Sequence, residues 1–228
     1  MNIKFNLKEI YPRVFLVTMD NSYDLAMTFC RAQEFYESPY KEIKGKYFTM
    51  AEFQRLYTMR RGEDCFTYPI DWAGFNVPSH IIDKCYGYHD EFEDINEYDD
   101  VIRVVYHKIT NSDINAQKYY LIGSQTGNKT TINHEVAHAF YYLHPSYKKA
   151  ANKITSQLPE KLYNKFKKHL LGIGYSDKSI KDEIQAYLSS DPENLTEING
   201  TSERENKIIN KISEQLKNLN NEYRTRKG

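Results

Sequence analysis

His134-Glu135-Val136-Ala137-His138, within the run Thr131 to Leu143, is the stretch around which this 228-residue chain is organised. Residues four apart lie one turn apart on the same face of a helix, so both imidazoles can reach one metal ion. Glu135 is offset by about 100° from His134 on a helix of 3.6 residues per turn. Its carboxylate would therefore lie beside the ion, where it can hold a water molecule. Neutral imidazoles suit Zn²⁺, and an open fourth position on the metal activates a bound water.

The remainder of this stretch favours an amphipathic helix. At about 100° per residue, Val136, Phe140 and Leu143 gather on one side. His134 and His138 gather on nearly the opposite side. One face would enter a core while the other faces a cleft. The alternative interpretation is a chance match of a five-letter pattern in an ordinary amphipathic helix.

The run Thr130 to Ala139 resembles the active-site helix of the zincin metallopeptidases, in which an alanine often follows the second histidine. The resemblance covers this helix and extends over about Val101 to Leu188. It implies a zinc-dependent peptidase with Zn²⁺ as cofactor and a peptide or protein as substrate. His134 and His138 would be metal ligands, and Glu135 would be the general base toward the metal-activated water.

A catalytic zinc site usually has three protein ligands, so the two imidazoles need a third. Glu183 is the favoured candidate, because it lies on the same stripe of a predicted helix as Ile180 and Ile184 and would point inward. A lone charge that faces a core is costly unless it is paired or bound to a metal. A salt bridge from Glu183 to Lys178 or Arg103 is the alternative.

The resemblance bears on this choice as well. A downstream helix that supplies a glutamate is similar to the gluzincin group of zincins, which usually has Asn where this chain has Asp182. Asp182 could instead orient His134 or His138. His144 is the rival third ligand, because the spacing His134-x9-His144 matches the metzincin pattern. That pattern requires Gly where this chain has Tyr141, and on a continuing helix His144 would turn away from the metal.

Composition and charge limit the partners that this chain is expected to bind. The 31 basic residues balance 31 acidic ones, so there is no general attraction to nucleic acid or to an anionic membrane. No stretch approaches the roughly 18 apolar residues of a membrane-spanning helix, and Met1 to Glu9 lacks the apolar core of a secretory signal. Cys30, Cys65 and Cys85 are odd in number and widely spaced, which favours reduced thiols in a cytoplasmic protein. The oligomeric state is not indicated.

Propensity and turn residues predict strands at 10–19, 101–109 and 118–123. A polar turn at 110–113 would join the last two strands in a hairpin just before the histidine-bearing helix. Helices are predicted at 22–37, 49–62, 79–85, 146–158, 159–171, 180–189 and 202–224, with a break at 192–200.

Two further stretches stand out by composition. The aromatic stretch 66–78 is predicted to be an ordered loop over the core, with a substrate-binding loop as the alternative. The acidic stretch 90–100 is predicted to be a solvated loop, with a calcium site as the alternative, although its spacing lacks the order of a calcium-binding loop.

These observations predict an α+β, zincin-like fold: a small, mostly antiparallel sheet that supports the active-site helix, followed by a helical C-terminal half. We expect a single catalytic domain over 1–200 and a C-terminal helical extension over 201–228.

The function that these residues favour is a zinc-dependent metallopeptidase-like hydrolase. Tyr187 and Tyr142 are candidates for an added hydrogen-bond donor to the reacting carbonyl oxygen. Two other classes stay open: a catalytically inactive zincin-fold protein with a binding or regulatory role, and a helical protein that binds no metal. The presence of Glu135 argues against an inactive site.

Overall fold

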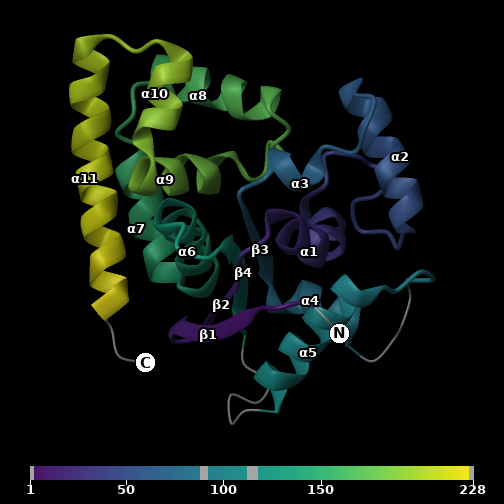
Figure 1. Ribbon diagram of the computed structural model, residues 1–228. Coiled ribbons are helices and arrows are strands. Elements are labelled where there is room, and N and C mark those ends of the chain that lie inside the picture. The colour runs from purple at the N-terminus through teal and green to yellow at the C-terminus, as the bar shows by residue number, and fades with distance from the viewer. Residues whose placement is uncertain (1–2, 88–91, 112–117, 226–228) are drawn as a thin grey trace. The chain divides into compact units, whose positions relative to one another are not determined.

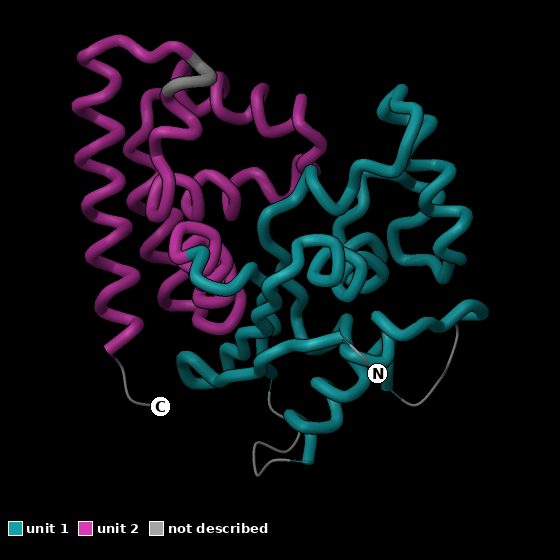
Figure 2. Tube along the Cα trace, viewed as in Figure 1, with its two compact units in different colours: residues 1–128 teal, residues 129–228 magenta. Residues whose placement is uncertain are grey.

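The computed structural model describes residues 3–87, 92–111 and 118–225, and Figure 1 labels its elements. The pattern of contacts divides the chain into two compact units, 1–128 and 129–228 (Figure 2). The sheet lies in the first unit, and the described elements of the second are all helices. This confirms the predicted α+β class with a helical C-terminal half. The predicted catalytic domain over 1–200, with an extension over 201–228, stays a prediction.

Unit 1 is built on a four-stranded sheet in the order β1-β2-β4-β3. Its strands are β1 (Asn6–Tyr11), β2 (Val14–Met19), β3 (Gly74–Pro78) and β4 (Tyr120–Gln125). The outer pairs β1–β2 and β3–β4 are antiparallel, whereas the central pair β2–β4 is parallel, with Phe15 opposite Leu121. The sheet is therefore mixed, and the expected mostly antiparallel pairing holds for its two outer pairs but not for the central one. A parallel central pair needs a long crossover, which the segment between β2 and β4 supplies.

The stretch 10–19, predicted as a strand that follows an early interruption at Pro12, contains the end of β1, the turn and all of β2. Pro12 has no backbone N–H to give to a strand ladder. Arg13 has a φ of 64°, and its amide donates to the Glu9 carboxylate at 2.7 Å. These two residues therefore make the turn between the strands.

Helix α1 (Ser22–Glu37) lies against β3 and β4 (Figure 1). It begins as predicted at Asn21, whose side chain accepts two backbone amides of the first turn. Gly123 of β4 lies directly beneath Phe29 of α1, and a Cβ at this glycine would come within 2.4 Å of the ring. Phe29 also stacks on Phe75 of β3, with 5.5 Å between ring centroids. The close approach of helix and sheet thus depends on a glycine in the central strand.

Two helices precede β3 in the sequence, α2 (Met50–Arg61) and α3 (Tyr68–Asp71), and α4 (Ser79–Tyr86) follows it. The predicted helices at 49–62 and 79–85 are confirmed as α2 and α4. The stretch 66–78 is not a loop, because it contains both α3 and β3. Phe75 and Val77 alternate into the core with the period of a strand, which the prediction overlooked.

The strand predicted at 101–109 is wrong, because this stretch belongs to helix α5 (Glu97–Thr110). Asn96 and Asp99 start the helix with a capping box. The β-branched residues favour a strand by propensity, yet the buried ones recur with a helical period. They are Val101, Ile102, Val105 and Ile109. The predicted hairpin into β4 is therefore also wrong, and part of its turn falls on residues 112–117, outside the described residues.

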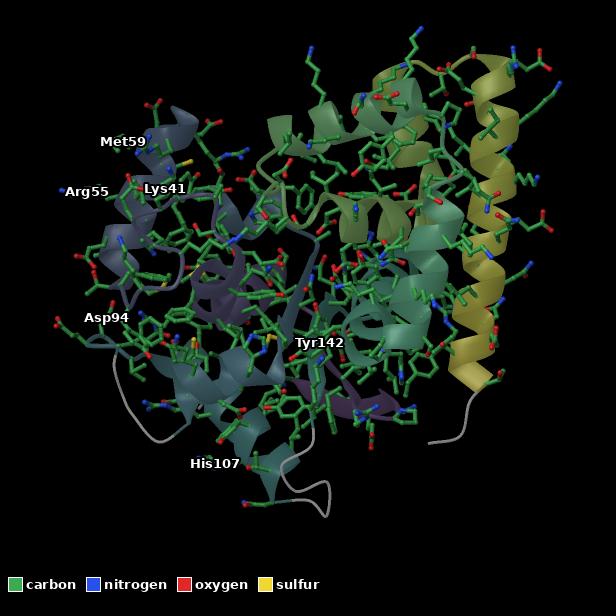
Figure 3. The ribbon with its side chains drawn as sticks, turned by 180° about the vertical axis from the view of Figure 1, so that it is seen from behind. Lys41, Arg55, Met59, Asp94, His107 and Tyr142 are labelled. Atoms are coloured by element: carbon green, nitrogen blue, oxygen red, sulfur yellow. The ribbon has the colours of Figure 1, made fainter. Side chains whose placement is uncertain are left out.

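The acidic stretch 90–100 reaches the core at Phe92 and Asp99, which are buried. Arg31 of α1 is 1% exposed, and its guanidinium pairs with Asp94 at 3.0 Å and with Asp99 at 2.9 Å. Asp94 lies on the segment that leads into α5 (Figure 3). Asp99 also accepts a hydrogen bond from the Tyr86 hydroxyl at 2.9 Å. The prediction of a solvated loop is wrong for Asp99, because a buried guanidinium needs buried counter-charge.

Unit 2 is a set of helices packed around a central one. They are α6 (Lys129–Leu143), α7 (Pro145–Thr155), α8 (Glu160–Gly172), α9 (Ile180–Ser190), α10 (Pro192–Asn199) and α11 (Glu203–Thr225). Helix α9 contacts each of the others, including the long helix α11 (Figure 1). The helices predicted at 146–158, 159–171, 180–189 and 202–224 are confirmed, with ends that differ by a few residues. The predicted break at 192–200 is instead α10, which starts with Pro192 at a position where proline suits a helix.

The three cysteines are free thiols, with Cys30 and Cys85 buried and Cys65 exposed. Among the described residues, no helix is both long enough and apolar enough to cross a membrane. A cytoplasmic location stays a prediction.

Candidate metal centre

Helix α6 carries both histidines of the pattern, as predicted. His138 is buried, and His134 lies at the border of the buried region. Their rings are 4.8 Å apart between centroids, and their Nε2 atoms are 3.1 Å apart. The four-residue spacing has thus turned the same nitrogen of each ring toward one point.

Glu183 reaches this point from helix α9. Its Oε2 atom lies 3.7 Å from Nε2 of His134 and 3.5 Å from Nε2 of His138. Donor atoms bound to one tetrahedral zinc at about 2.0–2.2 Å lie roughly 3.2–3.6 Å apart. The Glu183 Oε2 atom is buried and makes no hydrogen bond. The three side chains therefore form a buried His-His-Glu group that could hold a metal ion.

The second nitrogen of each imidazole is held by a neighbour on α9. Nδ1 of His138 lies 3.0 Å from Oδ1 of Asp182, and Nδ1 of His134 lies 3.3 Å from Oγ of Ser190. The Ser190 hydroxyl donates to the carbonyl oxygen of Ala186 at 2.7 Å, so its oxygen accepts the proton on His134. Both Nδ1 atoms are therefore donors, and both Nε2 atoms can present lone pairs toward Glu183.

Charges within this group depend on one another. Burial favours the neutral form of Glu183, but His138 and then His134 lower the pKa of its carboxyl to about 2. Burial opposes the charged form of His138, yet Asp182 and Glu183 raise the pKa of its ring well above the usual value of 6.5. Without a metal, protons supply the positive charge that these carboxylates require. A divalent cation can supply that charge to the same atoms, with release of protons.

Tyr187 lies beside His134, and Tyr175 lies beside Tyr187. The ring of Tyr187 is 4.6 Å from that of His134, and its hydroxyl is 3.2 Å from the hydroxyl of Tyr175. Burial is the main cause that raises the pKa of each tyrosine, and the carboxylates of Glu183 and Glu135 raise it further. The buried Glu135 is thus electrostatically coupled to the same tyrosine pair as Glu183. Sequence reasoning missed Tyr175, because it lies between α8 and α9 and belongs to no periodic stripe.

His144, the rival third ligand, lies at the junction of α6 and α7. Its ring packs against Phe140 at 6.0 Å and against Tyr223 at 5.2 Å between centroids. Pro145 begins α7 immediately after it. The geometry brings Glu183, rather than His144, to the two imidazoles.

Comparison with protein-family models, with curated proteins and with solved structures finds no match to this chain. The likeness to zincins therefore rests on the residues of the site. These residues are a buried His-His-Glu group on α6 and α9, consistent with an H-E-x-x-H metal site.

Proposed function

We propose that the chain is a zinc-dependent, metallopeptidase-like hydrolase that cleaves peptide bonds with a metal-activated water. The observation that supports this most is the convergence of His134, His138 and Glu183 from two helices, with 3.1 to 3.7 Å between their donor atoms. Glu135, the residue that such chemistry needs next to the first histidine, is present and 5% exposed.

The donor set favours zinc over harder cations. Two imidazole nitrogens and one carboxylate oxygen are a ligand combination typical of catalytic Zn²⁺ sites, whereas Ca²⁺ and Mg²⁺ prefer oxygen ligands alone. His134, His138 and Glu183 would hold the ion and leave one position open. When bound, Zn²⁺ would polarise the substrate carbonyl and lower the pKa of water at the open position.

Glu135 would move the proton. It follows His134 directly, so its side chain projects about 100° around the helix, beside the ligand set rather than into it. From there its carboxylate would accept a proton from the attacking water and later pass it to the leaving amine. Burial shields Glu135 from bulk solvent, which restricts this exchange to groups within the site.

Tyr187 is our candidate for a donor to the carbonyl oxygen as negative charge develops on it. Its ring lies against His134, and its hydroxyl is 3.2 Å from that of Tyr175. A phenol that keeps its proton can donate a hydrogen bond, and the pKa of Tyr187 is raised, first by burial.

Elemental analysis of untagged protein, combined with a peptidase assay, tests the proposal. We expect one equivalent of zinc per chain and cleavage of an unstructured protein such as casein, lost on chelation and restored by zinc. Zinc content well below one equivalent after zinc is supplied would rule out the metal site. Full zinc occupancy without cleavage of casein or of a mixed peptide library would favour the alternative, a zincin-fold protein with a binding role.

A further inference from the structure

A chain of buried polar side chains leads away from His138 through three more helices. Oδ1 of Asp182 accepts a hydrogen bond from Nε2 of Gln185 at 2.9 Å. Oε1 of Gln185 lies 2.9 Å from the Tyr147 hydroxyl, which lies 2.5 Å from the Asn220 side chain. Gln185 is on α9, Tyr147 on α7 and Asn220 on α11. We call Gln185, Tyr147 and Asn220 the positioning chain.

Burying these groups is costly. Gln185 and Tyr147 are 0% exposed and Asn220 is 3% exposed. An amide or hydroxyl removed from water without a partner is destabilising, so each of the three depends on the hydrogen bonds of its neighbours. Apolar side chains of similar size would pack the same space without that risk. The positioning chain therefore needs matched hydrogen bonds, which simple packing of α7, α9 and α11 would not require.

The direction of hydrogen bonding along the positioning chain is set at its Asp182 end, because a carboxylate can only accept. The Tyr147 hydroxyl has a single proton to donate. Oε1 of Gln185 and Oδ1 of Asn220 both face this hydroxyl, so its one proton is shared between two acceptors, and Gln185 presents its oxygen rather than its NH₂ group to Tyr147. Gln185 must then direct its own NH₂ group to Asp182. The same Asp182 oxygen faces Nδ1 of His138, so the positioning chain holds the carboxylate that orients this imidazole.

We propose that Gln185, Tyr147 and Asn220 are positioning residues for His138. Helix α11, which carries Asn220, thereby helps to orient this metal ligand. This inference rests on the proposed function, since it assigns a purpose to the orientation of a metal ligand. The Asp182 side chain is 26% exposed, so without the positioning chain it is free to rotate toward solvent. His138 would then lose the partner that aims Nε2 at Glu183.

The deciding experiment compares two tyrosine-to-phenylalanine variants in the full chain. Tyr147→Phe removes the hydroxyl of the positioning chain. Tyr223→Phe is the matched control, because Tyr223 is also buried between α7 and α11, and its hydroxyl lies 2.7 Å from Oγ of Ser146. Each variant deletes one oxygen at nearly constant volume, and both should lower the thermal midpoint of the metal-free protein.

Zinc affinity and the visible absorption spectrum of the cobalt-substituted protein distinguish the two variants. We expect Tyr147→Phe to weaken zinc binding by more than twofold and up to about tenfold, the lower end of the cost of losing a direct partner of a ligand, and to shift the cobalt spectrum. Tyr223→Phe should stay within about twofold of wild type with an unchanged spectrum. Equal losses of affinity in the two variants would mean that Tyr147 acts only in packing, and would overturn the proposal.

A second variant and a metal-independent measurement complete the test. Asn220→Leu leaves the bond between Tyr147 and Gln185 in place, so its loss of zinc affinity should be smaller than that of Tyr147→Phe. In metal-free protein, proton NMR can follow the hydrogen-bonded Nδ1 proton of His138. We expect faster exchange of this proton in Tyr147→Phe than in Tyr223→Phe.

The two proposals fail in different ways. If wild-type protein binds no zinc, the proposed function is wrong, whereas the exchange of the Nδ1 proton still reports on the link from Tyr147 to His138. If zinc binds but neither the proton exchange nor the affinity responds to Tyr147→Phe, the positioning chain is wrong and the metal centre stands.

Discussion

Each unit buries a glutamate on a helix, and the two glutamates behave in opposite ways. Glu34 on α1 of unit 1 is 5% exposed, Glu183 on α9 of unit 2 is 3% exposed, and each has a buried Oε2 without a hydrogen bond. Burial raises the pKa of Glu34 to about 7, although Ser38 and Tyr68 oppose the change. The pKa of Glu183 falls to about 2.

Because burial is nearly equal, the difference comes from the neighbours. Glu34 faces hydroxyl groups, which stabilise a carboxylate too weakly to offset the loss of water. Glu183 faces two imidazoles that can carry positive charge and that can also present lone pairs. A buried carboxylate is thus a candidate metal ligand only where its neighbours bring positive charge or other ligand atoms. This rule separates Glu183 from Glu34.

The largest expected effect concerns a third buried glutamate, Glu135. Glu135→Gln should keep zinc and fold but lower the rate of peptide cleavage about 10²–10⁴-fold, because an amide cannot accept the proton of the attacking water. Cleavage rates and zinc content of the two proteins measure this. Wild-type turnover in the variant would show that Glu135 is not the base.

The next largest effect compares the two glutamates directly. Glu183→Ala should weaken zinc binding more than about 100-fold, since loss of an outer-shell partner alone costs 10–100-fold. Glu34→Gln should leave zinc affinity unchanged. Competition with a chelator of known affinity measures both.

His144→Ala serves as the control for the rival ligand, and it should bind zinc as wild type does because His144 packs against Phe140 and Tyr223. Loss of zinc in His144→Ala, with zinc retained in Glu183→Ala, would make the site metzincin-like.

Glu34 predicts a dependence of stability on pH. Its folded-state pKa of about 7 lies above the ordinary value of 4.5, so the folded state binds more protons between these values. The contribution of Glu34 to the free energy of unfolding should therefore be fully present below pH 4.5 and fall by about 3 kcal/mol as pH rises through 7. Urea unfolding at pH 5 and pH 8, followed by fluorescence of Trp72 in unit 1, measures this change. In Glu34→Gln the decrease should be smaller by the contribution of Glu34, and the remainder belongs to groups such as His138, whose raised pKa acts in the same direction. A decrease of the full size in that variant would assign all of it to those other groups.

The smallest effect concerns the partners of the two imidazoles. Asp182→Asn should weaken zinc binding about tenfold, because a charged acceptor holds Nδ1 of His138 at 3.0 Å. Ser190→Ala should cost no more than about threefold, because a neutral hydroxyl holds His134 at the longer distance of 3.3 Å. Zinc titration of both variants measures the ratio. A larger loss in Ser190→Ala would reverse the ranking of the two partners.

Local patterns were sufficient for most of unit 2 and for part of the site. The spacing of His134 and His138 places them on one helix face regardless of what surrounds the helix. The apolar stripe that contains Glu183 predicted that its carboxylate points inward, and the side chain is buried in the structure. Caps such as Asn21 and Thr49 likewise marked the starts of α1 and α2, because a cap acts on its own first turn.

Unit 1 shows where local patterns failed. The β-branched run 101–109 fits a strand by propensity, but its buried stripe packs on α1 and α4 as a helix. The neighbouring Asp99 pairs with Arg31, 68 positions earlier in the chain. No window of local sequence contains that partner. The parallel pairing of β2 with β4 also joins segments far apart in the chain.

The sequence alone thus determined which side chains of the site share a helix face, since that depends only on the helical repeat. Tertiary structure decided which faces meet. Packing of α9 on α6 brings Glu183 to the two imidazoles and gives Asp182 to His138 and Ser190 to His134. The partners in each contact lie 44 to 56 residues apart, so each contact depends on how two helices dock, and no local periodicity records that docking.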